Sequence, residues 1–290
     1  MTEIRHEISA ADRAAMTTFR AELAAHPAPI TRASFDALFE RMPSPEGVDY
    51  TEASVRAVPG VWCVPRARRA AAALLYLHGG VFGYGSARAF RHVVGQMVVR
   101  TGVAAFIADY RLAPEHAFPA ALDDARAAYG GLATQYGDEH VAVIGDSAGG
   151  ELALTILLER PRVSCAVLLS PWTDLALTGG TFETKAADDP VLKRVALAAA
   201  ADAYLGGHDP RDPKASPLYG LAGVTSPVQV HVGTSEILLD DSLRLASEPQ
   251  IEVHVWEEMP HVFPSSLGVF TAAQEAHGLV AAFLRSALAV

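Results

Sequence analysis

The chain has 290 residues, enough for one large α/β domain or for one domain with a modest insertion. Half of the residues are hydrophobic, 19% are charged, and the formal net charge is −10. This acidic balance argues against nucleic-acid binding, which requires a basic face, and against a polybasic membrane anchor. The first residues include acidic side chains without an apolar core, and no apolar run reaches the length of a membrane span. We therefore expect a cytoplasmic protein without stable membrane insertion.

The cysteines show no metal-binding pattern. Cys63 and Cys165 lie far apart in strand-like runs, and no pair or cluster has the spacing of a zinc site. We expect two free, buried thiols, no metal and no other cofactor.

The first 48 or so residues have a helical pattern. Residues 10–25 carry helix-favouring side chains throughout. A second helix is expected over 33–41, after the N-cap residue Thr31. Two helices ahead of any strand make a poor independent domain, so we expect them to lie over another part of the molecule.

From residue 51 the hydrophobic pattern becomes that of strands. Residues 51–65 alternate and predict a two-stranded ribbon at a sheet edge. Further strands are expected over residues 71–77, 103–110, 141–146, 165–172, 228–233 and 251–256. Helical stretches lie between them, including 87–100, 120–136 and a C-terminal helix over 265–287. The alternation predicts an α/β fold with a mainly parallel sheet covered by helices on both faces.

One interval is longer than a crossover requires. More than fifty residues separate Trp172 from Pro227, with a helical run over 190–204. We expect part of this interval, about 175–215, to be an insertion that forms a small helical lid together with residues 1–48. The whole chain, 1–290, is then a single domain.

The chain is organised around a strand, a turn of small residues and an apolar helix, over residues 141–158. The turn Gly145-Asp-Ser147-Ala-Gly149 has the pattern G-x-S-x-G in the strand–turn–helix context that this pattern requires. A strand that reverses into a helix over one residue brings the flanking glycines into close contact and holds the serine in a strained conformation. Ser147 is therefore a candidate nucleophile. The alternative is a glycine-rich turn with an incidental serine.

Donors for an oxyanion are available in two places. One is the amide of Ala148, at the start of a helix, and the other is the turn of residues 78–81, His-Gly-Gly-Val, after an earlier central strand. Nearby, Asp109, Arg111 and Glu115 are expected to form a buried ion-pair cluster that supports this turn.

A general base should be a histidine on a loop after a late strand. We call the turn of residues 145–149 the elbow. The histidines near or after it are His140, His208, His231, His254, His261 and His277. The first precedes the elbow strand, two lie inside strands, the last lies in the C-terminal helix, and the one on the insertion is a distant alternative. His261 directly follows the last strand and is the candidate base.

The acid that orients this histidine should follow the penultimate strand. Residues 233–242 supply Glu236, Asp240 and Asp241. Glu236 comes first after the strand, whereas the aspartates resemble the acidic start of a helix, where they favour the helix dipole. We favour Glu236 and keep Asp240 as the alternative.

Taken together, the motifs resemble the hormone-sensitive-lipase-like (bacterial family IV) esterases of the α/β-hydrolase fold. The motifs are His78-Gly-Gly-Val-Phe, Asp109-Tyr-Arg-Leu-Ala-Pro-Glu115, Gly145-Asp-Ser-Ala-Gly-Gly150 and Met259-Pro-His-Val-Phe263. The resemblance implies Ser147 as nucleophile, His261 as base and an acid at position 236. It also implies oxyanion donors at Gly80, Val81 and Ala148, and a lid built from the N-terminal helices and the insertion.

The sequence departs from the family pattern at three positions. Val81 stands where a third glycine is usual, and a backbone donor survives there if the φ angle of Val81 is negative. Glu236 replaces the commoner aspartate. Glu151 stands where asparagine is common, and its charge is favourable at a helix start.

These observations predict a serine carboxylesterase that hydrolyses short- to medium-chain acyl esters through an acyl-enzyme. The alternatives are a lactone hydrolase or acetyl-hydrolase with the same triad, or a small-molecule receptor. The receptor is disfavoured because both Ser147 and His261 are present. Side chains expected near the substrate are Phe35, Leu38, Phe39, Phe82, Tyr84 and Trp172. The partner is a small-molecule ester, nucleic acid is excluded, and a homodimer is compatible with the sequence.

Overall fold

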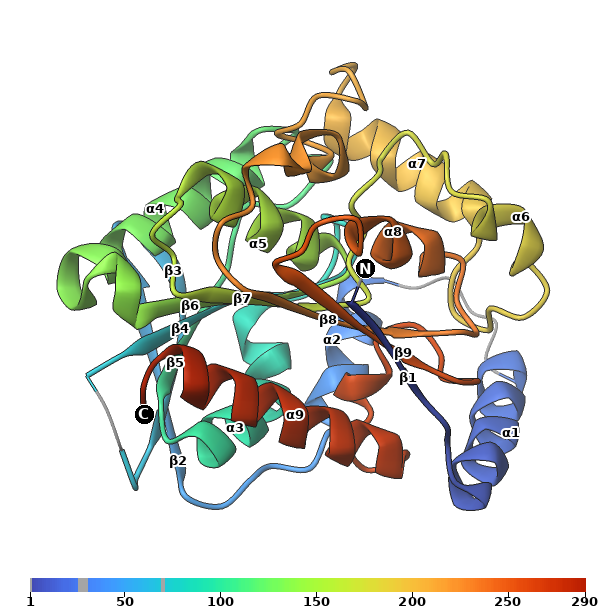
Figure 1. The fold of residues 1–290 in the computed structure, drawn as a ribbon, viewed down its shortest axis with the longest axis horizontal. Helices are drawn as coiled ribbons and strands as arrows, with labels where there is room; N and C mark the ends of the chain where they lie inside the picture. Colours follow the sequence, from blue (N-terminus) through green and yellow to red (C-terminus); the bar gives the residue numbers. More distant parts are fainter. Residues whose placement is uncertain (1, 26–30, 69–70) are drawn as a thin grey trace.

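The computed structural model describes residues 2–25, 31–68 and 71–290. Within them, nine strands form one sheet in the order β1-β9-β8-β7-β6-β4-β5-β3-β2 (Figure 1). The strands are β1 (Thr2–His6), β2 (Val48–Val55), β3 (Val58–Pro65), β4 (Ala73–Leu77), β5 (Ala104–Ala108), β6 (Val141–Asp146), β7 (Cys165–Leu169), β8 (Val228–Gly233) and β9 (Ile251–Trp256). The β2–β3 and β3–β5 pairings are antiparallel and the other pairings are parallel. The predicted α/β fold with a mainly parallel sheet is confirmed.

Helices cover both faces of the sheet. They are α1 (Ala10–Ala25), α2 (Arg32–Glu40), α3 (Ala87–Thr101), α4 (Ala120–Tyr136), α5 (Ala148–Glu159), α6 (Thr181–Thr184), α7 (Arg194–Leu205), α8 (Leu239–Leu245) and α9 (Thr271–Ala287). Helices α4, α5 and α8 pack on one face, and α3 and α9 pack on the other, where they also contact α2 and α1 (Figure 1). No helix in the described part of the chain is long and apolar enough to cross a membrane.

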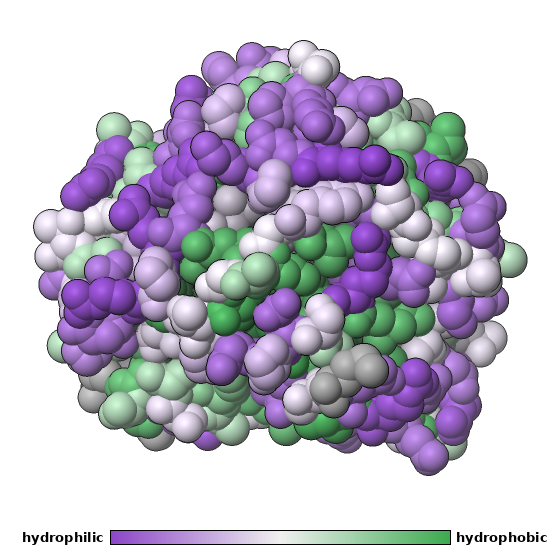
Figure 2. Space-filling view, turned by 45° about the horizontal axis from the view of Figure 1, so that its top comes forward, coloured by the Kyte–Doolittle hydropathy of each residue, from purple (hydrophilic) through white to green (hydrophobic). Residues whose placement is uncertain are grey.

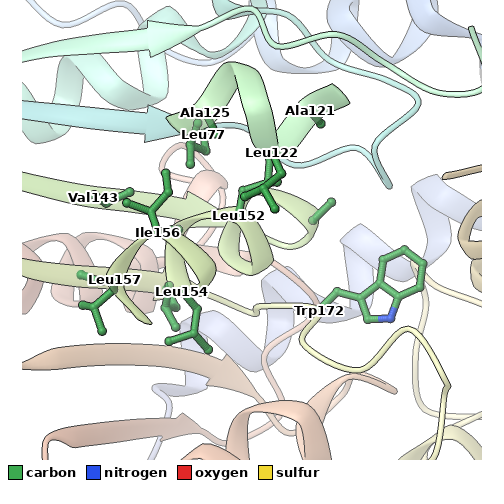
Figure 3. Close-up of a cluster of buried hydrophobic side chains, with 14 of the residues drawn as sticks. Leu77, Ala121, Leu122, Ala125, Val143, Leu152, Leu154, Ile156, Leu157 and Trp172 are labelled. Carbon is green, nitrogen blue, oxygen red and sulfur yellow. The ribbon is translucent and has the colours of Figure 1, made fainter. Parts of the chain in front are cut away.

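The core has one hydrophobic layer on each side of the sheet because successive residues of a strand point to opposite faces. Leu75 and Leu77 of β4 join the cluster beneath α4 and α5, whereas Leu74 and Tyr76 join the cluster beneath α3 and α9. Figure 3 shows the first cluster, where leucine and alanine side chains of α4 and α5 meet the sheet. Strands buried on both faces read as continuous apolar runs, which is why their positions were predictable.

The N-terminal segment differs from the expectation. Residues 2–6 form strand β1, which pairs in parallel with β9, so the prediction of helical structure throughout the first 48 residues is wrong there. Ile4 is the only aliphatic side chain in this strand, too few to give a visible alternation. The helices expected after it are present as α1 and α2.

The interval between β7 and β8 is largely irregular. It contains only α6, α7 and a 3₁₀ segment, Pro217–Gly223, within the described residues. Figure 1 shows α6 and α7 on the same side of the sheet as α8. Helix α1 contacts this insertion through a hydrogen bond from Arg20 Nη2 to the carbonyl oxygen of Asp188 (2.6 Å). Both thiols, Cys63 and Cys165, are free and buried as expected.

Candidate active site

Ser147 lies between β6 and α5 with φ 51° and ψ −119°, a region that L-residues rarely occupy. The glycines around it are required by space. A Cβ atom on Gly145 would lie 2.0 Å from the carbonyl oxygen of Gly149, and one on Gly149 would lie 2.0 Å from that of Leu77. The close approach that the motif predicts is therefore present.

The surrounding strands hold this strained residue in place. The amide of Ser147 donates to the carbonyl oxygen of Leu169 at the end of β7 (2.9 Å). The carbonyl oxygen of Ser147 accepts from the amide of Trp172 (3.0 Å). The conformation is thus fixed by the segment after β7 as well as by its own turn, as strained functional residues require.

Ser147, His261 and Glu236 form one hydrogen-bonded series. His261 Nε2 lies 3.0 Å from Ser147 Oγ, and His261 Nδ1 lies 2.7 Å from Glu236 Oε2. Because an ionised carboxylate only accepts, it favours the tautomer with the proton on Nδ1, which leaves Nε2 free to accept from the serine hydroxyl. This is the geometry of an activated serine nucleophile.

The alternative acids make other contacts. Asp240 Oδ2 accepts from the amide of Thr181 (3.1 Å). Asp241 Oδ2 accepts from the amides of Thr173 and Asp174 (2.8 and 2.9 Å). Burial, together with the nearby charge of Asp174, raises the pKa of Asp241 well above its usual range. Of the carboxyl groups left open by the sequence, the structure brings Glu236 alone into contact with His261.

The charges around His261 favour its protonated form. Burial of the imidazole lowers the pKa of His261, but the carboxylate of Glu236 opposes this directly, and Asp189 and Asp146 add to the effect. The net result is a pKa above the usual value for histidine. A base must be neutral to accept a proton, so this rise moves the acidic limit of its use toward neutral pH.

The turn after β4 presents unpaired amides beside the elbow. Within the described residues, the amides of Gly80, Val81 and Ala148 donate to no protein acceptor. The φ angles of Gly80 and Val81 are +113° and +49°. The condition set for a backbone donor at Val81, a negative φ angle, is therefore not met, although the amide of Val81 is unpaired among the described residues. The turn closes tightly because the amides of Gly83 and Tyr84 both donate to the carbonyl oxygen of Gly80 (2.9 and 2.8 Å), which leaves no room for an extended residue.

Asp146 fixes this turn to the elbow, and sequence reasoning missed it. Its Oδ1 accepts from the amide of Gly79 (2.9 Å) and from the hydroxyl of Tyr76 (2.8 Å). Burial raises the pKa of Asp146 to about 6, although both hydrogen bonds act in the opposite direction. It occupies the variable position of the G-x-S-x-G pattern, so the pattern itself carried no signal for its role.

Ser170 is a second residue that sequence reasoning missed. It is fully buried at the end of β7, and its Oγ donates to Glu236 Oε1 (2.7 Å) and accepts from the amide of Val262 (3.0 Å). Glu236 Oε1 also accepts from the amide of Gly233 (2.8 Å). One hydroxyl therefore links Glu236 to the residue that follows His261. The only sequence signal is a serine directly after a predicted strand.

Replacing Ser170 with alanine is expected to lower kcat about 10-fold, because Glu236 loses one of its two orienting donors and the amide of Val262 loses its buried acceptor. Ser164→Ala is the control, since Ser164 is a partly buried serine whose hydroxyl donates to the carbonyl oxygen of Ala287, away from the triad. Steady-state kinetics with p-nitrophenyl acetate measure both. Equal kcat values for the two variants would contradict the role assigned to Ser170.

The side chains expected near the substrate divide into two groups. Phe82 and Trp172 belong to the core cluster beneath α4 and α5, whereas Phe35 and Phe39 pack against the cluster beneath α3 and α9. Phe82 and Trp172 are fully buried, with ring centroids 5.9 Å apart. Tyr84 lies against Phe35 of α2 (5.8 Å). Phe39 stacks on Phe90 of α3 (4.1 Å), in the core layer on the far side of the sheet from α5. Leu38 is 49% exposed and is absent from the described core clusters.

The expected ion-pair cluster near the turn is wrong. Asp109 Oδ1 accepts from the amide of Ala87 at the start of α3, and Arg111 instead pairs with Asp124 of α4 (2.8 Å). Glu115 pairs with Arg32 of α2 (2.6 Å). Each of these three side chains contacts an opposite charge or a helix start in another segment. Proximity in the sequence does not reveal such partners.

Arg32 ties α2 to the loops beside the candidate active site. Besides Glu115, its guanidinium donates to the carbonyl oxygens of Gly83 (2.8 Å) and Ala113 (2.9 Å). Planar guanidinium groups suit such multiple contacts. Helix α2 thus contacts the turn that presents the unpaired amides.

The structure also bears on the expectations for Glu151 and for the two histidines inside strands. Glu151 is fully buried in α5, and burial raises its pKa well above the usual range, an effect that opposes the favourable charge expected at this helix start. His231 and His254 are accounted for inside the sheet, where His231 Nδ1 accepts from the indole of Trp256 (3.2 Å) and His254 stacks on His231 (4.7 Å). In the described ranges, no group of three or more potential ligand side chains is placed to hold a metal.

Comparisons with known proteins agree with this fold. Residues 74–265 match the family described as alpha/beta hydrolase fold. The chain is 37% identical to an acetyl-hydrolase of Streptomyces hygroscopicus, over 78% of this chain and 79% of that protein. It is 32% identical to a carboxylesterase/phospholipase, LipF, of Mycobacterium tuberculosis, over 80% of this chain and 65% of that protein.

Solved structures give the same result. A hormone-sensitive lipase from a metagenome library superimposes with a TM-score of 0.91 at 30% identity, covering 97% of this chain and 99% of that one. An esterase from the bacterial hormone-sensitive lipase family superimposes with a TM-score of 0.88 at 33% identity, with the same coverage. The chain is therefore a carboxylic ester hydrolase of the α/β-hydrolase fold. Within that class it belongs to the bacterial hormone-sensitive-lipase-like esterases.

Proposed function

We propose that this enzyme hydrolyses small acyl esters with Ser147 as nucleophile, His261 as general base and Glu236 as the acid that orients the base. The observation that carries the proposal is the continuous series of hydrogen bonds from Ser147 Oγ through His261 to Glu236. Among the described residues, no member of the series has a contact that would have to break before reaction. A small-molecule receptor has no need of the buried carboxylate behind His261.

In the first half-reaction, Ser147 Oγ attacks the ester carbonyl carbon while His261 Nε2 takes the hydroxyl proton. Glu236 stabilises the imidazolium that forms. The carbonyl oxygen becomes an oxyanion, for which the unpaired amides of Gly80, Val81 and Ala148 are the candidate donors. The intermediate collapses when the C–O bond to the alcohol breaks and His261 gives its proton to the leaving oxygen.

The second half-reaction uses the same groups. His261 Nε2 takes a proton from a water molecule, whose oxygen attacks the acyl carbon. The bond from that carbon to Ser147 Oγ breaks, and the proton returns to the serine. The products are a carboxylic acid and an alcohol, and the enzyme is regenerated.

The acyl group is proposed to be short. Phe82 follows the candidate oxyanion donor Val81, and the amide of Trp172 donates to Ser147, so both rings start from residues next to the reacting atoms. Tyr204 of α7 stacks on Phe82 with 3.7 Å between ring centroids, and all three rings are at most 1% exposed. These buried rings are proposed to limit the space for the acyl chain. The name of the Streptomyces relative, an acetyl-hydrolase, supports the same size class.

The proposal includes a lid over the substrate. The N-terminal helices and the insertion are proposed to border the substrate, because Arg32 of α2 reaches the candidate oxyanion turn and Tyr204 of α7 reaches Phe82. Figure 2, in which the upper side of Figure 1 comes forward, shows hydrophobic side chains gathered at the centre of that face within a mainly hydrophilic surround. A cytoplasmic location and a homodimer stay predictions.

A series of p-nitrophenyl esters of increasing acyl length tests this proposal. We expect kcat/KM to be highest for acetate to butyrate and at least about 10-fold lower for octanoate, because the longer chain meets the buried rings. Replacing Phe82 with alanine should reduce the difference in kcat/KM between short and long esters. Phe283→Ala is the control, because Phe283 lies in α9 and packs against the cluster on the opposite face of the sheet. A preference for octanoate in the wild-type enzyme would refute the short pocket. Failure of a serine-directed phosphonate to label Ser147 would refute the nucleophile.

A further inference from the structure

The insertion contains a buried carboxylate that takes no part in the proposed reaction. Asp189 lies in the loop from α6 to α7 and is 1% exposed. Its Oδ1 accepts from the amides of Val191 and Leu192 (2.7 and 2.8 Å). Its Oδ2 accepts from the amide of Ile237 (2.8 Å), which directly follows Glu236 in the chain. One side chain of the insertion therefore contacts the loop that carries the proposed acid.

A second contact holds the same loop. Thr181 Oγ1 donates to the carbonyl oxygen of Ile237 (2.8 Å) and accepts from the amide of Asp240 (3.0 Å). Strand β8 ends at Gly233, so the loop has left the sheet by this point. Both backbone polar groups of Ile237 are paired with the insertion. The backbone position next to Glu236 is thus set by a segment that lies outside the sheet.

Asp189 also acts on His261 through its charge. The titratable groups around this imidazole come from three segments: Glu236 from the loop after β8, Asp189 from the insertion, and Asp146 from the end of β6. Each of these carboxyl groups favours the imidazolium and raises the pKa of His261, against the effect of burial. Removing one of them should therefore weaken the effect without abolishing it.

We propose that Asp189 is a positioning residue for ester hydrolysis, which holds the Glu236 loop in register with His261 and adds its negative charge beside the imidazole. The inference rests on the proposed triad. It gives the insertion a role in catalysis that is separate from covering the substrate.

Asparagine at position 189 would preserve the size of the side chain but not its hydrogen bonds. The carboxylate accepts on both oxygens, whereas the amide of asparagine has one acceptor and one donor group. If the asparagine oxygen faces Val191 and Leu192, its NH₂ group meets the N–H of Ile237, and two donors repel. The reverse orientation turns the NH₂ group toward the amides of Val191 and Leu192, which then lose their acceptor. Either way the loop or the insertion must shift, and the charge is lost.

The test compares Asp189→Asn with Asp188→Asn. Asp188 is the neighbouring residue, its side chain is 55% exposed and pairs with Lys185, and its substitution removes the same charge. With p-nitrophenyl acetate, Asp189→Asn should lower kcat about 10- to 100-fold, with KM changed by less than about 3-fold. The acidic limb of the kcat/KM profile should move to lower pH, because a lower pKa keeps His261 neutral in more acidic solution. Asp188→Asn should match the wild-type enzyme in both.

Asp189→Glu separates the charge from the geometry. It keeps the carboxylate but is one methylene longer, so the acidic limb should return to the wild-type position while kcat stays reduced. Wild-type kcat for Asp189→Asn, or a lower kcat with an unmoved acidic limb, would overturn the proposal. If Asp189→Asn loses its cooperative thermal transition, Asp189→Glu decides the question, and wild-type kcat in that variant overturns the proposal. A wild-type protein that does not hydrolyse the ester would instead contradict the proposed function.

Discussion

Replacing Ser147 with alanine is expected to lower kcat for p-nitrophenyl acetate by about 10⁴-fold or more, with KM almost unchanged. The hydroxyl supplies the atom that bonds to the acyl carbon, and no other described side chain lies on His261 Nε2 to replace it. Binding of the ester depends on contacts around the carbonyl group and the acyl chain, which the substitution leaves in place.

His261→Ala should produce a loss of similar size, and the double variant should be no worse than either single variant. Nucleophile and base act as a unit, so removing the second group after the first costs little more. His277→Gln is the control, since His277 is a buried histidine whose ring contacts the carbonyl oxygen of Pro264 (3.0 Å) away from the serine. Near wild-type rates in Ser147→Ala or His261→Ala would contradict the proposed mechanism.

Glu236→Gln is expected to lower kcat by about 10⁴-fold, whereas Asp240→Asn should stay within about 3-fold of the wild-type enzyme. Glutamine can accept from His261 Nδ1 only by turning its NH₂ group toward the amide of Gly233 and the hydroxyl of Ser170, where donors already point. The opposite orientation presents a donor to Nδ1 and favours the tautomer that cannot accept the serine proton.

The pH profile of Glu236→Gln gives an independent readout. The carboxylate of Glu236 is the strongest of the charges that raise the pKa of His261, so its loss should lower that pKa and move the acidic limb of the residual activity to lower pH. The measurement is kcat/KM against pH for Glu236→Gln and for Asp240→Asn. A collapse of activity in Asp240→Asn alone would transfer the role of the acid to that residue.

Features fixed by short-range sterics or by periodic burial were predictable from the sequence. The elbow followed from the two glycines around Ser147, whose close approach is a local requirement. The central strands followed from continuous apolar runs such as residues 73–77, which are buried on both faces. The position of His261 followed from chain order, because the loop after the last parallel strand meets the same sheet edge as the elbow.

Features that depend on a choice between distant partners were not predictable. Several carboxylates near Arg111 in the sequence were equally plausible partners, and only the folded chain shows that it pairs with Asp124. Ser170 acquires its contacts with Glu236 and Val262 from segments far along the chain. Glu236 and Asp240 differ by four positions in sequence, and only three-dimensional placement separates them. The left-handed backbone at Val81 likewise depends on a loop closure that composition does not reveal.

Strand β1 also affects the tendency of the sheet edge to associate with other copies of the chain. Without it, β9 would present a row of unpaired backbone groups, which invites strand addition by a neighbouring chain. Residues 2–6 occupy that row and present a new rim on which Arg5 pairs with Glu3 and Glu257 (2.8 and 2.9 Å). Charged side chains on an outermost strand discourage edge-to-edge association. The first strand thus acts as built-in protection against unwanted sheet extension.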